Sequence, residues 1–497
     1  MRAIATFDIG TTNVKGVLMS VEGTPLYAES RNIETLYRGP DKSHLEQDPR
    51  QWYIAFCDIS MNFLTKCPPE DIAGIILSGQ MQDLILVDDA CEPVMDAILY
   101  SDGRAQAEAD EIARQIGMES LTHVTANAFD GSRPFAKLKW VKDHMPDTYA
   151  KATHALISSK DYVICRLTGK FVSDVVSCST AGLMDIQAKK WQNTWLDQMR
   201  LFEVQWPQIL HSHAIAGYVL PTAAKDVGYC SGTPVYAGSG DAGSATLSSG
   251  ISRDGEFNIN LGTSGWIACT SEVPLREPGV SNLAGMPENV YINVVPFFNA
   301  GNVHRWITNL LFEEGSQGDQ FAQMNSLLEE STPGSGGLLF LPYLVGERFP
   351  VMDSDIAGCF VDVRPNVGKP DLARACLEGV AYSIRQGLDA IGKVPLSISL
   401  VGGGAQSSVW CQILADMLHM PITVYKDAEY LPAMAISAAV LINQGHITNY
   451  AEFTSKIKMD ANCSVFSPDS DSSSLYDRSY ERYCSIYPAL KRLRSIT

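Results

Sequence analysis

The sequence has few positive charges for its length. It contains 38 Lys and Arg against 56 Asp and Glu over 497 residues, a formal net charge of −18. Binding to a DNA or RNA backbone needs clustered Lys and Arg, so nucleic acid is not an expected partner. The sequence also lacks the run of about 18 apolar residues that a membrane-spanning helix needs. The opening "MRAIATFDIG" has too short an apolar run before Asp8 for a signal peptide, so we expect a cytoplasmic protein without a membrane partner.

Several motifs of common enzyme classes are also missing. The 12 cysteines form no C-x-x-C pair and no His-Cys cluster at zinc spacing, which predicts reduced thiols in a reducing cytosol. The glycine-rich stretch "VGGGAQSS" is not followed by Gly-Lys-Ser/Thr, so it is not a Walker A loop. No G-x-S-x-G elbow is present, which argues against a serine hydrolase.

Strand-like and helix-like segments alternate along the chain, a pattern typical of α/β proteins. "AGIILSGQMQDLILVDD" predicts two buried strands, and "GRAQAEADEIARQIG" predicts a helix. A long helix is expected from near Pro370, with Arg374 and Glu378 one turn apart. Residues 467–474, "SPDSDSSS", are expected to be a loop before a tyrosine-striped terminal helix. At this length, two domains are expected rather than a single core.

A weak internal duplication divides the chain. "FDIGTTNVKGVL" at residues 7–18 and "NINLGTSGWIACT" at residues 258–270 both predict strand, Gly-Thr-Thr/Ser tip, strand, about half the chain apart. A tip repeated once per half suggests two similar domains that face each other. A chance match between two glycine hairpins is the alternative.

The first of these tips has the composition of a phosphate site. Gly10 permits a tight turn with positive φ, and the hydroxyls of Thr11 and Thr12 lie beside exposed amides. Such a nest suits phosphate oxygens. Asp8 on the incoming strand could orient a magnesium ion through water, and Lys15 is either a phosphate contact or an exposed strand lysine.

Two further stretches add chemistry. In "YAGSGDAGSATLSSG", Asp241 is surrounded by Gly, Ser and Ala, so a substrate hydroxyl could approach its carboxylate. The alternative role, a cap on the following helix, is compatible, since a helix N-terminus would help to keep Asp241 ionised. In "LVGGGAQSSVW", three glycines between a strand and a helix allow the backbone to approach a flat or anionic ligand closely.

Taken in order, these motifs resemble the FGGY carbohydrate kinases of the actin, hexokinase and heat-shock-chaperone ATPase superfamily. The resemblance extends from "FDIGTTNVKG" through "LEQDPRQW", "KDYVICRLTG", "GSGDAG", "LGTSG", "LPYLVGERFP" and "VGGGAQSSVW" to "AMAISAAVL", roughly residues 1–445. It implies an α/β fold of two ribonuclease-H-like domains with a cleft between them. The implied N-terminal domain spans residues 1–246, with the sugar side and the first hairpin, and the C-terminal domain spans residues 247–497, with the ATP side.

The resemblance assigns roles for ATP and Mg²⁺. It implies that Asp241 is the catalytic base, which takes a proton from a sugar hydroxyl, and that Asp8 and Asp241 lie near magnesium. The implied ATP-binding residues are Gly10, Thr11, Thr12 and Lys15 of the first hairpin, Gly262, Thr263 and Ser264 of the second, and Gly402, Gly403, Gly404 and Ala405 of the adenosine-side loop.

The sugar-side motifs imply a small open-chain acceptor. "SGQMQD" is similar to the G-Q-M-H stretch of xylulokinases with Gln82 in place of His, and "YSDGRA" is similar to W-x-D-x-R. The implied substrate-binding residues are Gln80, Met81, Gln82, Asp102, Arg104 and Asp241. These motifs indicate a kinase that converts D-xylulose to D-xylulose 5-phosphate. Gluconate, another pentulose or a polyol as acceptor is the alternative, and a non-catalytic actin-like nucleotide-binding protein is the alternative from another class. A homodimer is expected at the family level. Glu347 and Arg348 are expected to form a buried pair.

Overall fold

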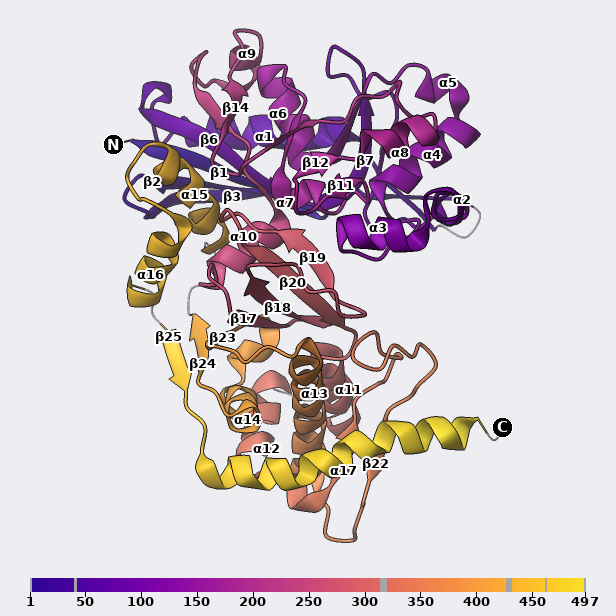
Figure 1. Cartoon of the computed structure of the whole chain (residues 1–497). Coiled ribbons are helices and arrows are strands. Elements are labelled where there is room, and N and C mark those ends of the chain that lie inside the picture. The colour runs from indigo at the N-terminus through magenta and orange to yellow at the C-terminus, as the bar shows by residue number, and fades with distance from the viewer. Residues whose placement is uncertain (1, 40–42, 313–319, 426–430, 461–462, 496–497) are drawn as a thin grey trace.

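A computed structural model describes residues 2–39, 43–312, 320–425, 431–460 and 463–495 of the chain (Figure 1). Two seven-stranded sheets form its framework within these residues. The first sheet has the order β14 (Ile215–Tyr218), β15 (Pro234–Tyr236), β6 (Ile72–Gly79), β1 (Ala3–Ile9), β2 (Asn13–Ser20) and β3 (Pro25–Asn32), with β16 (Ser239–Gly240) also paired to β6. The second has the order β19 (Ser281–Ala284), β20 (Tyr291–Phe297), β18 (Gly265–Ser271), β17 (Glu256–Leu261), β23 (Ser397–Val401), β24 (Ile422–Tyr425) and β25 (Cys463–Phe466).

Smaller sheets and the helices complete the fold. A five-stranded sheet contains β4 (Leu36–Arg38), β5 (His44–Gln47), β8 (Ala97–Ile98), β7 (Met81–Val87) and β9 (His154–Ser158). Strand pairs are β10 (Val172–Asp174) with β13 (Gln208–Leu210), β11 (Met184–Asp185) with β12 (Lys190–Trp191), and β21 (Leu339–Leu341) with β22 (Cys359–Val361). The helices of the first half are α1 (Pro49–Phe63), α2 (Gln106–Ile116), α3 (Met118–Thr125), α4 (Pro134–His144), α5 (Pro146–Tyr149), α6 (Ser159–Thr168), α7 (Val175–Cys178), α8 (Asn193–Gln198), α9 (Ala223–Val227) and α10 (Asp241–Ser248). Those of the second half are α11 (Gly301–Leu311), α12 (Gln320–Glu329), α13 (Lys369–Ile391), α14 (Ser408–Leu418), α15 (Leu431–Asn443), α16 (Tyr450–Asp460) and α17 (Ser470–Arg494).

The internal duplication is visible in the strand pairing. β1 pairs antiparallel with β2 and parallel with β6, and β17 likewise pairs antiparallel with β18 and parallel with β23. Each half therefore begins with a hairpin whose tip is Gly-Thr-Thr or Gly-Thr-Ser, followed by a parallel neighbour strand. This is the two-domain arrangement of the actin and hexokinase superfamily. The expected domain boundary after residue 246 lies inside α10.

The two halves share part of their hydrophobic core. One buried cluster contains Ile4 of β1, Leu247 of α10, Ile292 of β20 and Ala439 of α15. In Figure 1 the gold helix α15 lies beside β1 and β2, although in sequence it lies between β24 and β25 of the second sheet. Two larger clusters fill the separate halves.

The long helices follow the sequence pattern closely. α13 begins one residue before Pro370, and Arg374 donates to Glu378 at 2.8 Å within it. The terminal helix α17, yellow at the bottom of Figure 1, packs Tyr476 and Tyr483 against Tyr382 of α13. The expected loop at residues 467–474 is partly wrong, because Asp469 caps α17 by accepting from the Ser472 N–H at 2.8 Å, and the helix therefore begins at Ser470.

One expectation about the cysteines is wrong. Cys91 and Cys165 form a disulfide, and the ten other cysteines form none. The loop after β7 and the helix α6 bring the two Cα atoms to 6.1 Å, a separation that a disulfide can bridge. No sequence signal indicates this pair, which is 74 residues apart. Among the described helices, none is long and apolar enough to cross a bilayer.

Candidate active site

Strand register places Asp241 beside the first hairpin tip. β6 lies between β1 and β16, with Gly79 paired to Ile9 on one side and to Gly240 on the other. Gly10 and Asp241 therefore leave the same edge of the sheet. Neighbouring strands are about 4.8 Å apart, so two spacings separate these chain ends by about 10 Å.

Small residues are required where this strand meets α10. A Cβ on Gly240 would lie 1.9 Å from Met81 Sδ, and Gly238 has φ +68° with a built Cβ only 1.8 Å from the Leu77 carbonyl oxygen. Any side chain at either position would displace the strand end. The glycines that flank Asp241 in the sequence thus serve close packing, which fixes where its carboxylate begins.

A buried ion pair anchors the same strand end. Asp174 accepts from the Gly240 N–H at 3.3 Å and pairs with Lys160 at 2.8 Å, and both side chains are fully buried. Asp161 is the second partner of Lys160, at 2.6 Å. The stretch "KDYVICRLTG" gives no sign of this role for Lys160, because only the fold brings it under the strand that precedes Asp241.

The surroundings of Asp241 shift its acidity. Its carboxylate is accessible to solvent but protein atoms crowd it, and the resulting loss of hydration, together with the negative charges of Asp8 and Asp174, raises its pKa to about 7. The Ala242 N–H at the start of α10 donates to it at 2.7 Å and lowers the pKa. The helix N-terminus does favour the ionised form of Asp241, as expected, but this effect is smaller than that of burial. A carboxylate with a pKa near neutrality is well matched to general base catalysis.

Asp8 faces Asp241 across the sheet edge and suits a metal ion. Burial raises its pKa, while a hydrogen bond from Ser78 at 2.8 Å and the charge of Lys15 lower it. Asp8, Lys15 and Ser78 line one small pocket beneath the N-terminal turn of α15. Mg²⁺ is usually held by one or two carboxylates together with substrate phosphates and water, and the mutual repulsion of Asp8 and Asp241 is what a divalent cation between them would relieve. The donor set therefore fits Mg²⁺.

The first hairpin turns without the positive φ that was expected. Gly10 is absent from the residues with positive φ, and its N–H donates to the Asn13 carbonyl at 3.0 Å. A Cβ on Gly10 would lie 3.1 Å from that carbonyl oxygen, so close backbone approach favours glycine here. Thr12 is exposed at the tip, where its hydroxyl and the neighbouring amides are available to a phosphate.

Two glutamines hold this tip in place. Thr11 donates to Gln80 Oε1 at 2.5 Å, and Gln80 Nε2 donates to Gln47 Oε1 at 3.1 Å. Gln47 in turn donates to the Thr11 carbonyl at 2.7 Å and accepts from Trp52 Nε1 at 3.0 Å. Gln80 is 1% exposed, so its hydrogen bonds position the hairpin, and its contact with a sugar stays a prediction. Gln47 lies in the stretch "LEQDPRQW", which gives no sign of its contact with the hairpin tip.

The second hairpin and the triple glycine line one pocket of about 540 Å³, which is a typical size for a ligand site. Gly402 has φ +95°, and a Cβ there would lie 2.6 Å from the Leu261 carbonyl oxygen, which brings the loop against the hairpin. Predicted residues of its lining are Gly262, Thr263, Gly403 and Gly404. Ser264 is exposed at the hairpin tip, whereas Ala405 packs against the hydrophobic core.

Several residues of this pocket were not found from the sequence, His304, Arg305 and Trp410 among them. Arg305 NH2 donates to Thr263 Oγ1 at 3.3 Å, and His304 stacks on Trp410 with ring centroids 5.9 Å apart. His304 and Arg305 lie on α11, and Trp410 on α14. Their spacing in sequence carries no signal, because separate helices bring them together.

The sugar-side strand β7 leads away from Asp241. Met81 touches the Cβ position of Gly240, and the next residue, Gln82, has φ +67°. Gln82 Nε2 donates to Ser132 Oγ at 2.7 Å, its Oε1 accepts from Arg133 at 3.3 Å, and its carbonyl accepts from Lys137 at 3.1 Å. Met81 therefore lies against the residue before Asp241, with Gln82 next to it, and α4 with the loop before it supplies the second layer. Contact of Met81 and Gln82 with a sugar stays a prediction.

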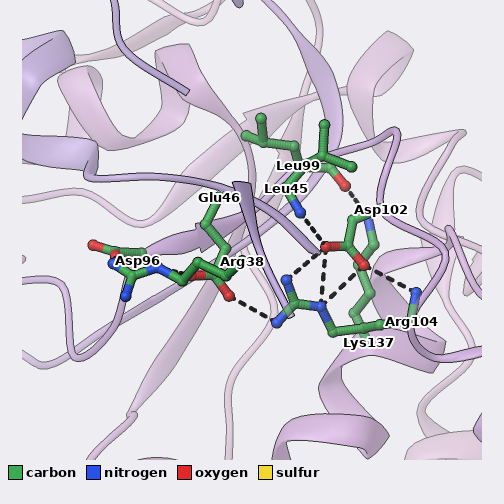
Figure 2. A network of polar contacts seen from close by, with 8 residues as sticks. All are labelled: Arg38, Leu45, Glu46, Asp96, Leu99, Asp102, Arg104 and Lys137. Carbon is green, nitrogen blue, oxygen red and sulfur yellow. Dashed lines mark hydrogen bonds and ion pairs between the residues drawn. The ribbon is translucent and has the colours of Figure 1, made fainter. Parts of the chain in front are cut away.

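Asp102 and Arg104 lie in a buried network of charged side chains. Figure 2 shows the Arg104 guanidinium between Asp102 and Glu46, at 2.6 and 2.7 Å. Asp102 also accepts from the Leu45 N–H at 2.7 Å and is fully buried. Arg104 lies over the Trp140 ring at 5.0 Å. Both side chains form these contacts within the protein and brace the sugar-side sheet, and their contact with a sugar stays a prediction.

The expected Glu347–Arg348 pair is also wrong. Glu347 is 2% exposed and accepts from the Phe298 N–H at 2.7 Å and from Asn299 Nδ2 at 2.9 Å. Arg348 contributes only its backbone N–H to Glu347, and the residue is exposed. The backbone after residue 347 directs the arginine away from the carboxylate.

Comparison with known proteins agrees with this architecture. The chain matches the N-terminal domain of the FGGY family of carbohydrate kinases over residues 3–248 and the C-terminal domain over residues 257–440. It is 28% identical to a xylulose kinase from Staphylococcus xylosus, with 90% of this chain and 91% of that protein covered. It is also 28% identical to a gluconokinase from Bacillus licheniformis, with 85% and 84% covered.

Solved structures give the same result. The crystal structure of a xylulose kinase from Rhodospirillum rubrum has a TM-score of 0.89 at 26% identity and covers 99% of each chain. That of a gluconate kinase from Lactobacillus acidophilus has a TM-score of 0.87 at 25% identity and covers 98% of each chain. With both domains matched in order, this chain belongs to the FGGY family of carbohydrate kinases.

Proposed function

We propose that this sugar kinase transfers the γ-phosphoryl group of ATP to the terminal hydroxyl of a small open-chain sugar, with Asp241 as general base. The observation that supports this most directly is the placement of Asp241, which leaves the sheet edge beside the first Gly-Thr-Thr tip with its pKa raised to about 7. The conversion of D-xylulose to D-xylulose 5-phosphate is the reaction favoured by the sequence motifs and by relatives named xylulose kinase. Gluconate is the second candidate acceptor, because other relatives are named gluconokinase.

In this proposal ATP lies between the two hairpins. The adenosine occupies the pocket of about 540 Å³ beside Gly403 and Gly404. The phosphates extend toward both hairpin tips, Gly10–Thr12 of the first hairpin and Gly262–Ser264 of the second. Lys15 lies on the first hairpin. Backbone amides at such turns and hydroxyls of threonine and serine bind phosphate oxygens in proteins of net negative charge. Asp8 and Asp241 would hold Mg²⁺, which neutralises phosphate charge when it is bound.

Asp241 acts on the acceptor hydroxyl. Its carboxylate accepts the proton as the hydroxyl oxygen bonds to the γ-phosphorus, and the bond from that phosphorus to the bridging oxygen of ADP breaks. Removal of a base in this role costs about 10²–10⁴-fold in rate. The protein otherwise contributes positioning and charge neutralisation, which dominate phosphoryl transfer.

The two-half architecture supports a closing motion. Residues 1–246 would supply the acceptor side and residues 247–497 the nucleotide side, so a bound sugar between them favours closure. Closure excludes water that would otherwise accept the phosphoryl group. A cytoplasmic location is part of the proposal, because the cytoplasm supplies the ATP.

A coupled ADP-release assay tests the proposal with pentuloses, hexuloses, D-gluconate and glycerol as acceptors. We expect ADP release that depends on the acceptor, and its loss in Asp241→Ala. ADP release at the same rate without any acceptor would overturn the kinase assignment. A filament-forming or chaperone-like ATPase, the alternative from another class, would behave in that way, and activity of Asp241→Ala within a few-fold of the parent would remove the base.

A further inference from the structure

Arg133 is a buried cation that forms no ion pair with any residue that the structure describes. It is 9% exposed and precedes α4 directly. Its NH1 makes two long hydrogen bonds, to Gln82 Oε1 at 3.3 Å and to the Thr180 carbonyl at 3.4 Å. Its Nε is buried and has no hydrogen-bond partner within the described structure. Buried charges are normally paired, because an unpaired one costs several kcal/mol of desolvation.

Connectivity places Arg133 on the wall of the acceptor site. Its first partner, Gln82, follows Met81, which packs against Gly240 beside Asp241. Its second partner, Thr180, lies just after α7, the helix that Asp174 caps. Both elements that hold Arg133 are therefore the ones that position the base.

The charges around Arg133 leave it partly compensated. Burial lowers the pKa of Arg133, the charge of Asp130 raises it, and the charge of Arg348, an exposed residue from the other half of the chain, lowers it. Asp130 accepts from the Ser132 N–H at 2.9 Å and from the Ser132 hydroxyl, and it forms no ion pair with Arg133 among the described residues.

We propose that Arg133 binds a carboxylate at the end of the acceptor remote from the phosphorylated hydroxyl, so that sugar acids, the class of the second candidate acceptor, are preferred over neutral ketoses. This inference rests on the proposed kinase activity and names its substrate class. A carboxylate supplies the partner that Arg133 Nε lacks, since a guanidinium matches it with two parallel hydrogen bonds. Arg133 is then a determinant of specificity, while D-xylulose remains a weaker acceptor held by Gln82 alone.

The test compares acceptors that differ in charge. The kcat/KM of the parent protein is measured for D-gluconate, D-xylonate and D-xylulose at saturating ATP and Mg²⁺. D-xylonate and D-xylulose have the same number of carbons, so length is controlled. We expect at least about 10-fold higher kcat/KM for the better of the two acids than for D-xylulose, since hydrogen bonds to charged groups are the stronger ones.

Variants assign the effect to the arginine. Arg133→Met should lower kcat/KM for the acids by about 100-fold, chiefly through KM, and change that for D-xylulose by less than about 3-fold. Arg133→Lys should restore part of the loss because it keeps the charge but not the two-pronged geometry. Arg364→Met, at an exposed arginine elsewhere on the surface, is the matched control and should change neither. Calorimetric titration of D-gluconate without turnover gives a second readout of the same loss.

Three results would overturn the inference. If the parent phosphorylates D-xylulose but neither acid, the preference is absent while the kinase proposal stands. If Arg133→Met lowers kcat/KM equally for acids and ketose, Arg133 has only a structural role. If the parent phosphorylates no acceptor, the kinase proposal fails, and this inference fails with it. If Arg133→Met does not fold, the comparison of acids with D-xylulose in the parent protein tests the inference by itself.

Discussion

The placement of Asp241 can be tested by adding one methyl group beside it, as Gly240→Ala. Gly240 has φ −56° and ψ 152°, which alanine adopts freely, so the effect is steric and not conformational. The new carbon would lie 1.9 Å from Met81 Sδ, 2.5 Å from Met81 Cγ and 3.0 Å from Ser177 Oγ. Ordinary contact starts near 3.4 Å, so the strand end or Met81 must move by about 1.5 Å in total.

The magnitude follows from how that movement divides. If Met81 and the strand share it, Asp241 shifts by roughly 0.7 Å, and misplacement on the order of 1 Å costs up to about 100-fold in rate. We therefore expect kcat/KM for the acceptor to fall about 30–100-fold, while overpacking lowers the free energy of unfolding by about 1–3 kcal/mol. The assay is coupled ADP release, with thermal unfolding to separate the two effects.

A matched control is available in the same half of the chain. Gly103 also has a φ that alanine tolerates, and no atom lies within 4 Å of its built Cβ, so Gly103→Ala should stay within about two-fold of the parent. Activity of Gly240→Ala within three-fold of the parent would refute the reasoning, because it would mean that Asp241 does not depend on this strand end for its position.

Three further predictions concern acidity, the nucleotide pocket and stability. The kcat/KM of the parent should fall as pH drops below about 7, since protonated Asp241 cannot accept a proton. Asp8→Asn should move the midpoint of that pH profile lower, because it removes a negative charge that raises the pKa of Asp241. Gly402→Ala should raise KM for ATP at least about 10-fold, since its methyl would lie 2.6 Å from a backbone carbonyl oxygen at φ +95°; an unchanged KM would dissociate this loop from the nucleotide. Arg374→Met leaves Glu378, which is 2% exposed, without its cation. The free energy of unfolding in urea titration should fall by about 3–5 kcal/mol. A loss below about 1 kcal/mol would mean that the remaining hydrogen bonds of Glu378 are enough to stabilise its buried charge.

The features predicted from the sequence are local ones. Each of them lies in one short segment, where turn residues and hydrophobic periodicity can be recognised. They are the two Gly-Thr hairpins, the small residues around Asp241 and the helix that begins near Pro370. Their order along the chain was enough to indicate the family and the two-domain fold.

What the sequence could not show depends on long-range contacts. Gln80 was predicted to bind the sugar, and only the fold brings it to Thr11 of the hairpin tip, 69 residues away. Asp102 and Arg104 were likewise predicted to bind the sugar, and only the fold brings Glu46 and the Leu45 N–H against them (Figure 2). A motif records which side chains are present, whereas burial decides whether they face a ligand or one another.

Arg133 is the opposite case, because the fold singles it out and the sequence does not. It has no motif of its own, and only the fold shows that its guanidinium is buried beside Gln82 and forms no ion pair within the described part of the chain. Lys160 and Asp174 also lack a sequence signal, although they support Gly240, the residue before the base. The residues that set the position and preference of the site are therefore the ones that sequence reasoning reaches last.

The central claim is that the Asp241 carboxylate takes the acceptor's proton during phosphoryl transfer. Rapid-quench single turnovers with Asp241→Asn test it most directly, because the amide keeps the size and hydrogen-bonding reach of the side chain but does not act as a base. The account predicts a transfer rate about 10²–10⁴-fold below the parent, with dissociation constants for acceptor and ATP nearly unchanged. A single-turnover rate for Asp241→Asn within a few-fold of the parent would contradict it.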